Sequence, residues 1–343
     1  MKIQEQFLPL PQNAKTPYKW GKPVLSASKQ PGDWECEIDC PFVFSCNGRY
    51  GMTYVGFDGI GYRTGLAFSD DLIHWEKQGM IIDRIKDVPY LENSIALTWI
   101  LRENGLFSPG ELKQVNGEYI GVYFAMPEQG YEAGPGAIGI CRSQDLLHWK
   151  VEEPFLLPEE GRTWEQGGLY KACLVEDKGT YYLFYNAKNK TEYESPETTG
   201  QVFQRCFSWH EQIGVACSQD LKNWTRYEGN PIVRNGGPGT PDERVVGDAC
   251  VLKDDGQWYF FNYCIDAESK TYDRVAVGGD LLHPSKCEEI LVTSGKPGSF
   301  DDDMACKPAV IAKNGVLYHF YTATSAKGEN CITFATSQEI IEN

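Results

Sequence analysis

Apolar runs alternate with short polar turns along the whole chain, and the same order of segments occurs five times. Each unit opens with two apolar runs that flank a Gly-containing turn, a pattern typical of a β-hairpin whose turn needs positive φ. The five turns are Asn47-Gly48, Asn116-Gly117, Lys178-Gly179, Asp255-Gly256 and Asn314-Gly315. Every unit is therefore predicted to begin with two antiparallel strands.

The second half of each unit repeats as well. Residues 181–185 and 258–263 are almost continuously apolar, as expected for strands that are covered on both faces. A third strand leads into a Ser-x-Asp-Leu turn followed by Trp, and the short polar side chains of this turn can hydrogen-bond the backbone. The clear copies of the turn are residues 69–75, 143–149 and 218–224. A fourth strand containing proline, such as residues 230–233, belongs on a sheet edge because proline has no N–H to donate.

Five units of four strands predict an all-β chain folded as a five-bladed β-propeller with four-stranded antiparallel blades. A β-sandwich with similar turns is the alternative. The fifth unit ends before a fourth strand, whereas residues 21–25 resemble residues 229–233. We therefore expect the N-terminal segment, residues 20–27 or so, to complete the last blade and close the ring without an open edge. Residues 1–343 are accordingly predicted to form a single domain.

The formal net charge of −16 argues against nucleic acid and anionic membranes as partners, because both require clustered Lys and Arg. No run of about 18 apolar residues occurs, and the N-terminal region lacks the apolar segment of a signal peptide. A cytoplasmic protein, or one trimmed of its leader, is expected, and no particular oligomeric state is predicted. The 12 cysteines include no Cys-x-x-Cys pair and several fall within predicted strands, which indicates buried free thiols in a reducing compartment.

Charged or polar residues recur where the first strand of each unit should begin. In a propeller these positions surround the central axis, so they are expected to converge on one pocket. They are Asp39, the step from Ser108 to Glu111, Lys171, Asp248 and Lys307. Such groups are costly to bury without partners, which favours a functional site. The alternative is that the acids and the lysines pair with one another and plug the channel.

Several motifs resemble those of a known group of enzymes. Asp39-Cys40-Pro41 precedes the first hairpin, Ser108-Pro109-Gly110-Glu111 lies in the second unit and Gly247-Asp248-Ala249 in the fourth, with Ser-x-Asp-Leu-x-x-Trp turns between them. In this order they are similar to the five-bladed glycosidases of the superfamily that contains glycoside hydrolase families 43, 32, 117 and 130. The resemblance extends over nearly the whole chain and implies a carbohydrate substrate.

By resemblance to family 43, Asp39 is expected to be the general base, and an inverting mechanism is favoured. Two positions depart from that family: Lys171 stands where an orienting Asp is expected, and Asp248 stands where a Glu-Gly-Pro acid is expected. The Asn-Asp-Pro-Asn and Arg-Asp-Pro motifs of family 32 do not occur. Lys171 and Lys307 weakly resemble the phosphate-binding basic residues of family 130 phosphorylases.

Glycosidic bond cleavage needs one protonated carboxylic acid and one ionised carboxylate. Asp39 is predicted to be the base, and Asp248 or Glu111 the acid or orienting group. Lys171 and Lys307 are predicted to bind substrate and to hold one acid ionised. If the acids do not neutralise both lysines, the lysines would favour a negatively charged sugar; mutual pairing is the simpler account.

Aromatic residues make up 13% of the chain, and sugar-binding sites use such side chains as stacking platforms. Trp99 and Trp164 lie outside the regular strand positions and are predicted to bind substrate, as is Glu165. His210 and His319 could ligate a central calcium, as the resemblance to family 43 implies for some members. No other cofactor and no further metal is expected.

Two functions from different classes follow from these patterns. The first is a glycoside hydrolase that acts on a small oligosaccharide or glycoside, with a glycoside phosphorylase as its variant. The second is a non-catalytic carbohydrate-binding propeller, because a fold by itself does not confer chemistry. Several converging carboxylates favour the enzyme, since a binding protein needs donors and acceptors but no pair of acids.

Overall fold

The computed structural model describes residues 7–190 and 209–341. Its regular elements are strands, apart from two short 3₁₀ helices, η1 (Gln12–Ala14) and η2 (Pro158–Glu160). Neither of these helices has the length and apolar character needed to cross a membrane, and no other helix occurs in the described ranges. The all-β class predicted from the sequence is confirmed.

The strands form antiparallel sheets that follow one another in chain order. The first sheet contains β3 (Glu37–Cys46), β4 (Arg49–Phe57), β5 (Tyr62–Ser69) and β6 (Glu76–Ile82). The second contains β7 (Ala96–Ile100), β8 (Gln114–Val115), β9 (Glu118–Ala125), β10 (Ala137–Ser143) and β11 (Lys150–Val151).

The next sheet consists of two groups that a parallel bridge between Glu211 and Val245 joins. The first group contains β12 (Gly168–Asp177), β13 (Thr180–Lys188), β14 (Glu211–Ser218) and β15 (Thr225–Arg226). The second contains β16 (Val245–Asp254), β17 (Gln257–Ile265), β18 (Thr271–Gly278), β19 (Ser285–Lys286) and β20 (Val292–Thr293). The last sheet contains β21 (Met304–Lys313), β22 (Val316–Thr324), β23 (Asn330–Thr336), β1 (Tyr18–Lys19) and β2 (Leu25–Ser26).

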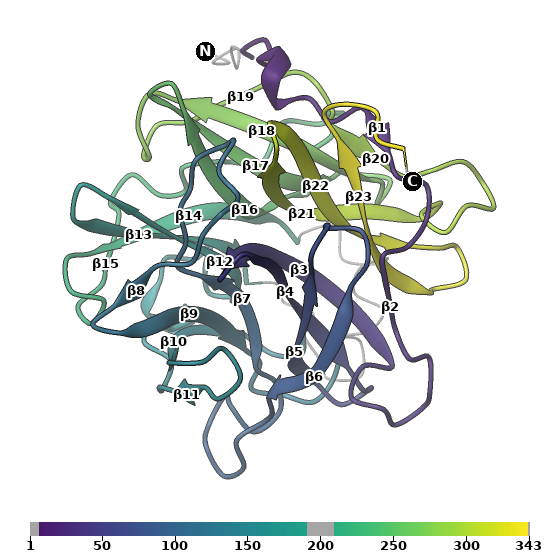
Figure 1. The fold of residues 1–343 in the computed structure, drawn as a ribbon. Coiled ribbons are helices and arrows are strands. Elements are labelled where there is room, and N and C mark those ends of the chain that lie inside the picture. The colour runs from purple at the N-terminus through teal and green to yellow at the C-terminus, as the bar shows by residue number, and fades with distance from the viewer. Residues whose placement is uncertain (1–6, 191–208, 342–343) are drawn as a thin grey trace.

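The sheets are arranged around a common centre, and their first strands lie nearest to it (Figure 1). In sequence around this centre, β3 contacts β7, β7 contacts β12, β12 contacts β16, β16 contacts β21, and β21 contacts β3 again. Fully buried aromatic side chains fill the space between and within the sheets, among them Phe44, Tyr123, Phe184 and Phe261. Blades of a β-propeller are arranged in this way, which brings the beginnings of the inner strands together.

The predicted Ser-x-Asp-Leu turns are held by hydrogen bonds from the backbone to the aspartate. In the first turn, Asp71 Oδ1 accepts from the backbone N–H groups of Ile73 and His74, both at 2.8 Å. The same pair of hydrogen bonds is made by Asp145 and Asp220 in the later turns. The repeated sequence therefore encodes a repeated local structure, as a side chain that mimics a backbone turn should.

The N-terminal segment lies against the last sheet. β1 pairs with β23 through Tyr18 and Thr336, and β2 pairs with β23 through Leu25 and Ile332. The segment thus joins the strand that the sequence analysis expected it to join, although it does so as two short strands rather than one.

We expect Leu25→Ala to lower the free energy of unfolding by about 2–5 kcal/mol, because it removes a buried side chain from this junction. Leu25 is 4% exposed and belongs to a cluster with Phe320, Ile332 and Phe334. Denaturant unfolding of the variant measures the loss, and Ser26→Ala, at an exposed neighbour on the same strand, should change stability by less than about 0.5 kcal/mol. Equal, small effects of both substitutions would mean that the segment contributes little to the fold.

The second sheet differs from the sequence prediction. The second unit is predicted to begin at the step from Ser108 to Glu111, but its inner strand is β7, which precedes that step. The Asn116-Gly117 turn does form a hairpin, and it joins β9 to the two-residue β8. The prediction was wrong because a local turn signal identifies a hairpin without showing which segment continues to the axis.

Candidate active site

A β-bulge interrupts each of the five inner strands β3, β7, β12, β16 and β21. The register shifts lie between Asp39 and Phe42, Leu97 and Trp99, Tyr170 and Ala172, Gly247 and Cys250, and Cys306 and Ala309. Positive φ angles within three of the bulges are 50° at Cys40, 55° at Asp248 and 70° at Lys307. Bulges redirect side chains, and strained backbone of this kind is concentrated at functional sites.

The bulges surround a central pocket. Its lining residues are Asp39, Cys40, Val55, Tyr62, Phe124, Glu132, Tyr170, Lys171, Asn186, Asp248, Tyr263 and Lys307. Four of the residues predicted from the sequence are therefore brought together here, namely Asp39, Lys171, Asp248 and Lys307. The roles assigned to these four from the sequence stay predictions.

Asp39 is buried and accepts hydrogen bonds at both carboxylate oxygens. Oδ1 accepts from the Cys40 backbone N–H at 2.7 Å and from the Thr322 hydroxyl at 2.8 Å. Oδ2 accepts from the Lys307 ammonium and from the Tyr131 hydroxyl, the latter at 3.4 Å. Burial opposes ionisation, but the charge and hydrogen bond of Lys307, with the other donors, outweigh it and lower the pKa of Asp39. Asp39 is thus a carboxylate in a buried ion pair with Lys307.

Glu211 stands at the start of β14, is 2% exposed and is not among the pocket-lining residues, but it contacts two of them, Asn186 and Tyr263. Burial, reinforced by the charge of Glu132, raises the pKa of Glu211 to about 7, although Lys188 and the Asn186 amide act in the opposite direction. Asn186 and the Tyr263 hydroxyl both donate to Oε2, the second at 3.4 Å. Oε1 accepts no hydrogen bond from the described side chains.

Two further carboxyl groups line the pocket. Asp248 is 3% exposed, and burial raises its pKa to about 6 against the charges of Lys171 and Lys307. Glu132 lies in the connection between β9 and β10 with φ 50°, and within the described part of the chain its carboxyl accepts no hydrogen bond. The site therefore combines a buried carboxyl group with a pKa of about 7, Glu211, with a carboxyl group that accepts no hydrogen bond from the described residues, Glu132.

Glu111 and Glu165 do not reach the pocket. Glu111 accepts a hydrogen bond from the Ser45 hydroxyl, and Ser45 lies about 20 Å further along β3 than Asp39. Glu165 is 1% exposed and accepts from the Tyr185 hydroxyl as well as, at 3.0 Å, from Arg226. The predicted placement of both residues at the site was wrong, because each meets its partners elsewhere in the fold.

The two predicted tryptophan platforms are part of the packed interior. Trp164 stacks on Tyr185 with ring centroids 6.2 Å apart and does not line the pocket. Trp99 is 2% exposed and lies under the buried guanidinium of Arg102, 4.9 Å from it. Trp99 is therefore not available for stacking on a sugar, and the half-buried Trp164 stacks on Tyr185 instead.

Arg102 bridges two of the inner strands. Its guanidinium donates to the backbone carbonyl of Val43 on β3 and, at 2.8 Å, to that of Val310 on β21. Burial lowers the pKa of its guanidinium. Arg102 thus links two inner strands, and the pairing of acids with lysines that the sequence left open does occur, between Lys307 and Asp39 and, at 3.9 Å, between Lys171 and Asp248.

The predicted central calcium finds no suitable ligands in the described ranges. His319 is fully buried, and its ring nitrogens face Thr16 Oγ1 at 3.2 Å and Asp273 Oδ2 at 3.0 Å. No group of three or more His, Cys, Asp or Glu residues suited to a metal occurs among the residues described. Every described cysteine is a free thiol, in agreement with the sequence.

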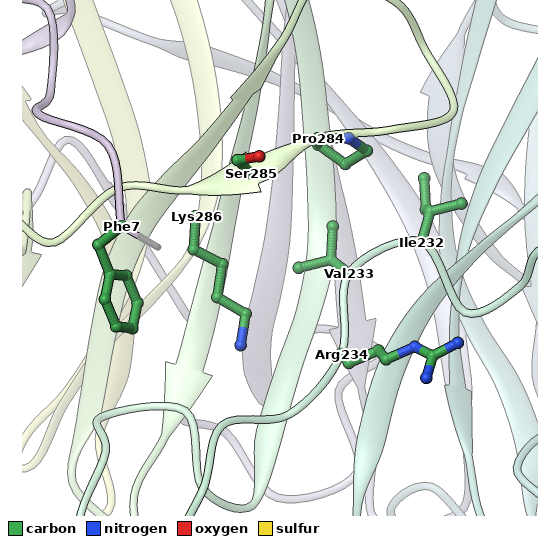
Figure 2. A pocket seen from close by; sticks show the side chains of 7 residues that line it. All are labelled: Phe7, Ile232, Val233, Arg234, Pro284, Ser285 and Lys286. Atoms are coloured by element: carbon green, nitrogen blue, oxygen red, sulfur yellow. The ribbon is translucent and has the colours of Figure 1, made fainter. Parts of the chain in front are cut away.

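A second hollow opens at the outer edges of the sheets, between β19 and the segment Ile232–Arg234 (Figure 2). Its lining residues are Phe7, Ile232, Val233, Arg234, Pro284, Ser285 and Lys286. These residues include no carboxyl group, so the hollow lacks the acid and base that the central pocket combines. The central pocket is the candidate active site.

Sequence reasoning missed Glu132, Glu211 and Asn186. Glu132 comes from a connection, Glu211 from the first residue of a third strand and Asn186 from the far end of a second strand. A charged residue at the start of an otherwise apolar strand, as in Glu211-Gln212-Ile213, is the one signal that could have identified Glu211.

Comparisons with known proteins give consistent results. A family model described as "Glycosyl hydrolases family 32 N-terminal domain" matches residues 103–274. The 1,2-beta-oligomannan phosphorylase of Thermoanaerobacter sp. (strain X514) is 27% identical over 173 residues, 48% of this chain and 47% of that protein. The levanase of Bacillus subtilis (strain 168) is 27% identical over 142 residues, 41% of this chain and 19% of that protein. The matched stretches thus span less than half the length of either relative.

A solved structure described as "Glycoside hydrolase" has a TM-score of 0.78 and 27% identity, covering 96% of this chain and 94% of that protein. A solved complex of BT0996 and RGII has a TM-score of 0.80 and 28% identity, covering 97% of this chain and 94% of its counterpart. The likeness therefore extends over the whole ring of sheets. The matched family region contains Glu132, Lys171, Glu211 and Asp248, whereas Asp39 precedes it.

Proposed function

The chain belongs to the family described as "Glycosyl hydrolases family 32 N-terminal domain". From this premise we propose that the chain is a glycoside hydrolase, and that its central pocket cleaves a glycosidic bond by means of two carboxyl groups. The observation that carries the proposal is the buried Glu211, with a pKa raised to about 7, beside a second carboxyl group. Glycoside hydrolysis uses such a pair, one carboxyl group protonated and the other not.

Glu211 is the proposed general acid. A pKa near the working pH lets the group hold a proton in the resting enzyme and release it to the departing oxygen. Burial supplies that pKa, and Asn186 and Tyr263 fix the carboxyl group through Oε2. Oε1 then faces the glycosidic oxygen.

Glu132 is the proposed second carboxylate, which attacks the anomeric carbon or activates water. It lines the pocket and has no hydrogen-bond donor on its carboxyl among the described residues. Asp39, the base predicted from the sequence, is the alternative, since Lys307 and the other donors lower its pKa. Its four donors occupy the acceptor sites that a reacting carboxylate needs, so we assign Asp39 to holding Lys307 in place. Asp248 orients the substrate.

The resemblance to family 43 predicts that the reaction inverts the anomeric configuration, and this stays a prediction of the proposed mechanism. If Glu132 activates water, the product has the inverted anomeric configuration; if it attacks carbon, the configuration is retained. Proton NMR of the first anomer released distinguishes the two routes.

A phosphorylase is the second candidate, because the Thermoanaerobacter relative is named as one and the pocket contains Lys171 and Lys307. Lys307 is already paired with Asp39, and the pocket-lining carboxyl groups of Asp39, Glu132 and Asp248 would repel phosphate. Hydrolysis is therefore favoured.

The test is a panel of nitrophenyl glycosides, pyranosides and furanosides, assayed with and without added phosphate. We expect release of nitrophenol without phosphate for at least one member. Turnover that requires phosphate would identify a phosphorylase, and binding without turnover of any member would favour the non-catalytic carbohydrate-binding propeller.

The pH dependence of the best substrate should follow Glu211. We expect kcat/KM to fall as the pH rises through about 7, because the acid loses its proton there. The free energy of unfolding should also fall as the pH rises. The pKa of Glu211 in the folded protein lies above the ordinary 4.5, so the stability contributed by its bound proton is complete below pH 4.5 and is lost as the pH rises to about 7. A flat alkaline limb in the wild type would contradict the assignment.

The finer architecture is part of the same proposal. Five blades, closed by the N-terminal segment into one domain, account for the cycle of contacts among the five inner strands and for the pairing of β1 and β2 with β23. A single cooperative unfolding transition, lost when the N-terminal segment is removed, is the expected behaviour.

A further inference from the structure

Lys171 presents to the pocket an ammonium that donates no hydrogen bond to the described residues. The side chain lies in the bulge of β12, is 4% exposed and lines the cavity. Its Nζ has no hydrogen-bond partner among the described residues. The nearest carboxylate oxygen, Asp248 Oδ2, is 3.9 Å away, which is beyond hydrogen-bond distance. Asp248 balances the charge of this ammonium, but its N–H groups make no hydrogen bond to the described residues, which is costly in a buried position, so a ligand atom is expected to accept from it.

Asn186 presents an unpaired acceptor beside it. Asn186 on β13 pairs in register with Tyr170, the residue before Lys171, and is 2% exposed. Its amide nitrogen donates to Glu211, whereas its Oδ1 accepts no hydrogen bond from the described residues. Gly247 allows the close approach of this side chain, because a Cβ there would lie 2.8 Å from the amide group. The pocket thus contains a free donor and a free acceptor on adjacent strands.

A hydroxyl group fits these two atoms and the neighbouring carboxylate. It can accept from Lys171 and at the same time donate to Asn186 Oδ1 or Asp248 Oδ2. A carboxylate or phosphate group could accept from Lys171, but it would then face the Asp248 carboxyl and the Asn186 carbonyl oxygen with no proton to give. The lysine charge is matched by Asp248 at 3.9 Å, and the charge of Lys307 by Asp39.

We propose that Lys171, Asn186 and Asp248 form a hydroxyl-recognition site, and that the sugar bound in the pocket is an uncharged, hydroxylated one rather than a uronate or a sugar phosphate. The inference rests on the proposed function, since it names the substrate class of the same pocket. It assigns Lys171 to substrate binding: the ammonium contacts the sugar and takes no part in proton transfer.

The test is direct binding, measured by calorimetry, with matched probes. The probes are methyl glycosides of neutral sugars in furanose and pyranose form, together with methyl glucoside against methyl glucuronide and methyl galactoside against methyl galacturonide. Wild type is compared with Lys171→Met, which keeps the aliphatic side chain and removes the ammonium. Lys113→Met is the control, because Lys113 is exposed and paired with Glu176 away from the pocket.

We expect the best neutral probe to bind wild type at least tenfold more tightly than any uronate. Lys171→Met should weaken that binding about 10–100-fold, the effect of losing a hydrogen bond to a charged group. On a cleaved substrate the variant should raise KM by a similar factor and change kcat less than about threefold. Binding of the neutral probe should be nearly the same in about 50 mM and about 500 mM salt, whereas an anion held by a lysine would bind less tightly at high salt.

Preferred, salt-sensitive binding of a uronate would overturn the inference, as would wild-type affinity in Lys171→Met or no binding of any neutral probe. The inference and the proposed function can fail separately. Lys171-dependent binding without hydrolysis of any panel member would contradict the proposed catalysis and leave the hydroxyl-recognition site standing. Hydrolysis with an unchanged KM in Lys171→Met would contradict the hydroxyl-recognition site and leave the proposed glycoside hydrolase activity standing.

Discussion

Glu211→Gln is expected to reduce turnover of a glycoside with a poor leaving group by about 10²–10⁴-fold, the usual contribution of a general acid. Glutamine keeps the size of the side chain and an oxygen for the hydrogen bonds from Asn186 and Tyr263, but it has no proton to donate. The measurement is kcat and kcat/KM on the alkyl or natural glycoside that wild type cleaves fastest.

The leaving group distinguishes loss of an acid from general damage to the site. A dinitrophenyl glycoside departs without protonation, so Glu211→Gln should cleave it within about tenfold of the wild-type rate. The alkaline limb of the pH profile should also disappear in the variant. Equal losses on both substrates would instead mean that Glu211 holds the pocket in shape.

The stability of this variant provides an independent control. Because burial raises the pKa of Glu211 to about 7, the neutral glutamine avoids the burial of a charged group at higher pH. We therefore expect the melting temperature to be unchanged or raised. Glu243→Gln, at a carboxyl group outside the central pocket, should leave activity unchanged.

Glu132→Ala is expected to reduce turnover by about 10³-fold or more on every substrate, including dinitrophenyl glycosides, because the reacting carboxylate is needed whatever the leaving group. Added azide or formate should restore part of the rate by entering the space that the carboxylate leaves. The measurement is the rate of nitrophenol release at increasing azide, with identification of the glycosyl azide formed.

Asp39→Asn separates the two candidates for this role. If Asp39 serves to hold Lys307, its loss leaves a buried ammonium without its carboxylate and should lower stability by about 3–5 kcal/mol, with no rescue of activity by azide. If Asp39 is the reacting base, as the sequence suggested, Asp39→Asn abolishes turnover at unchanged stability and Glu132→Ala retains activity. The paired variants therefore decide the assignment whichever way they turn out.

The strands and turns of this protein could be predicted from the sequence because their causes are local. A Gly-containing turn needs positive φ, and the aspartate of each Ser-x-Asp-Leu turn hydrogen-bonds backbone groups two and three residues ahead. Their fivefold recurrence was enough to predict an all-β ring and to place Asp39, Lys171, Asp248 and Lys307 near one axis. The same reasoning failed at Glu111, where the hairpin was correct but the inner strand comes earlier in the chain.

The partners and proton affinities of the site depend on distances between segments that no local pattern contains. Glu132 and Glu211 come from different parts of the second and third sheets, and the pKa of Glu211 is raised because the surrounding strands exclude water from it and because the charge of Glu132 lies nearby. Likewise, Lys171 and Lys307 look alike in the sequence. In the structure, however, Lys307 hydrogen-bonds the Asp39 carboxylate, whereas Lys171 Nζ lies 3.9 Å from Asp248 Oδ2. Hydrogen bonding along a few residues thus determined the elements of this protein, and desolvation and charge between its packed sheets decided which of its carboxyl and ammonium groups are free to act.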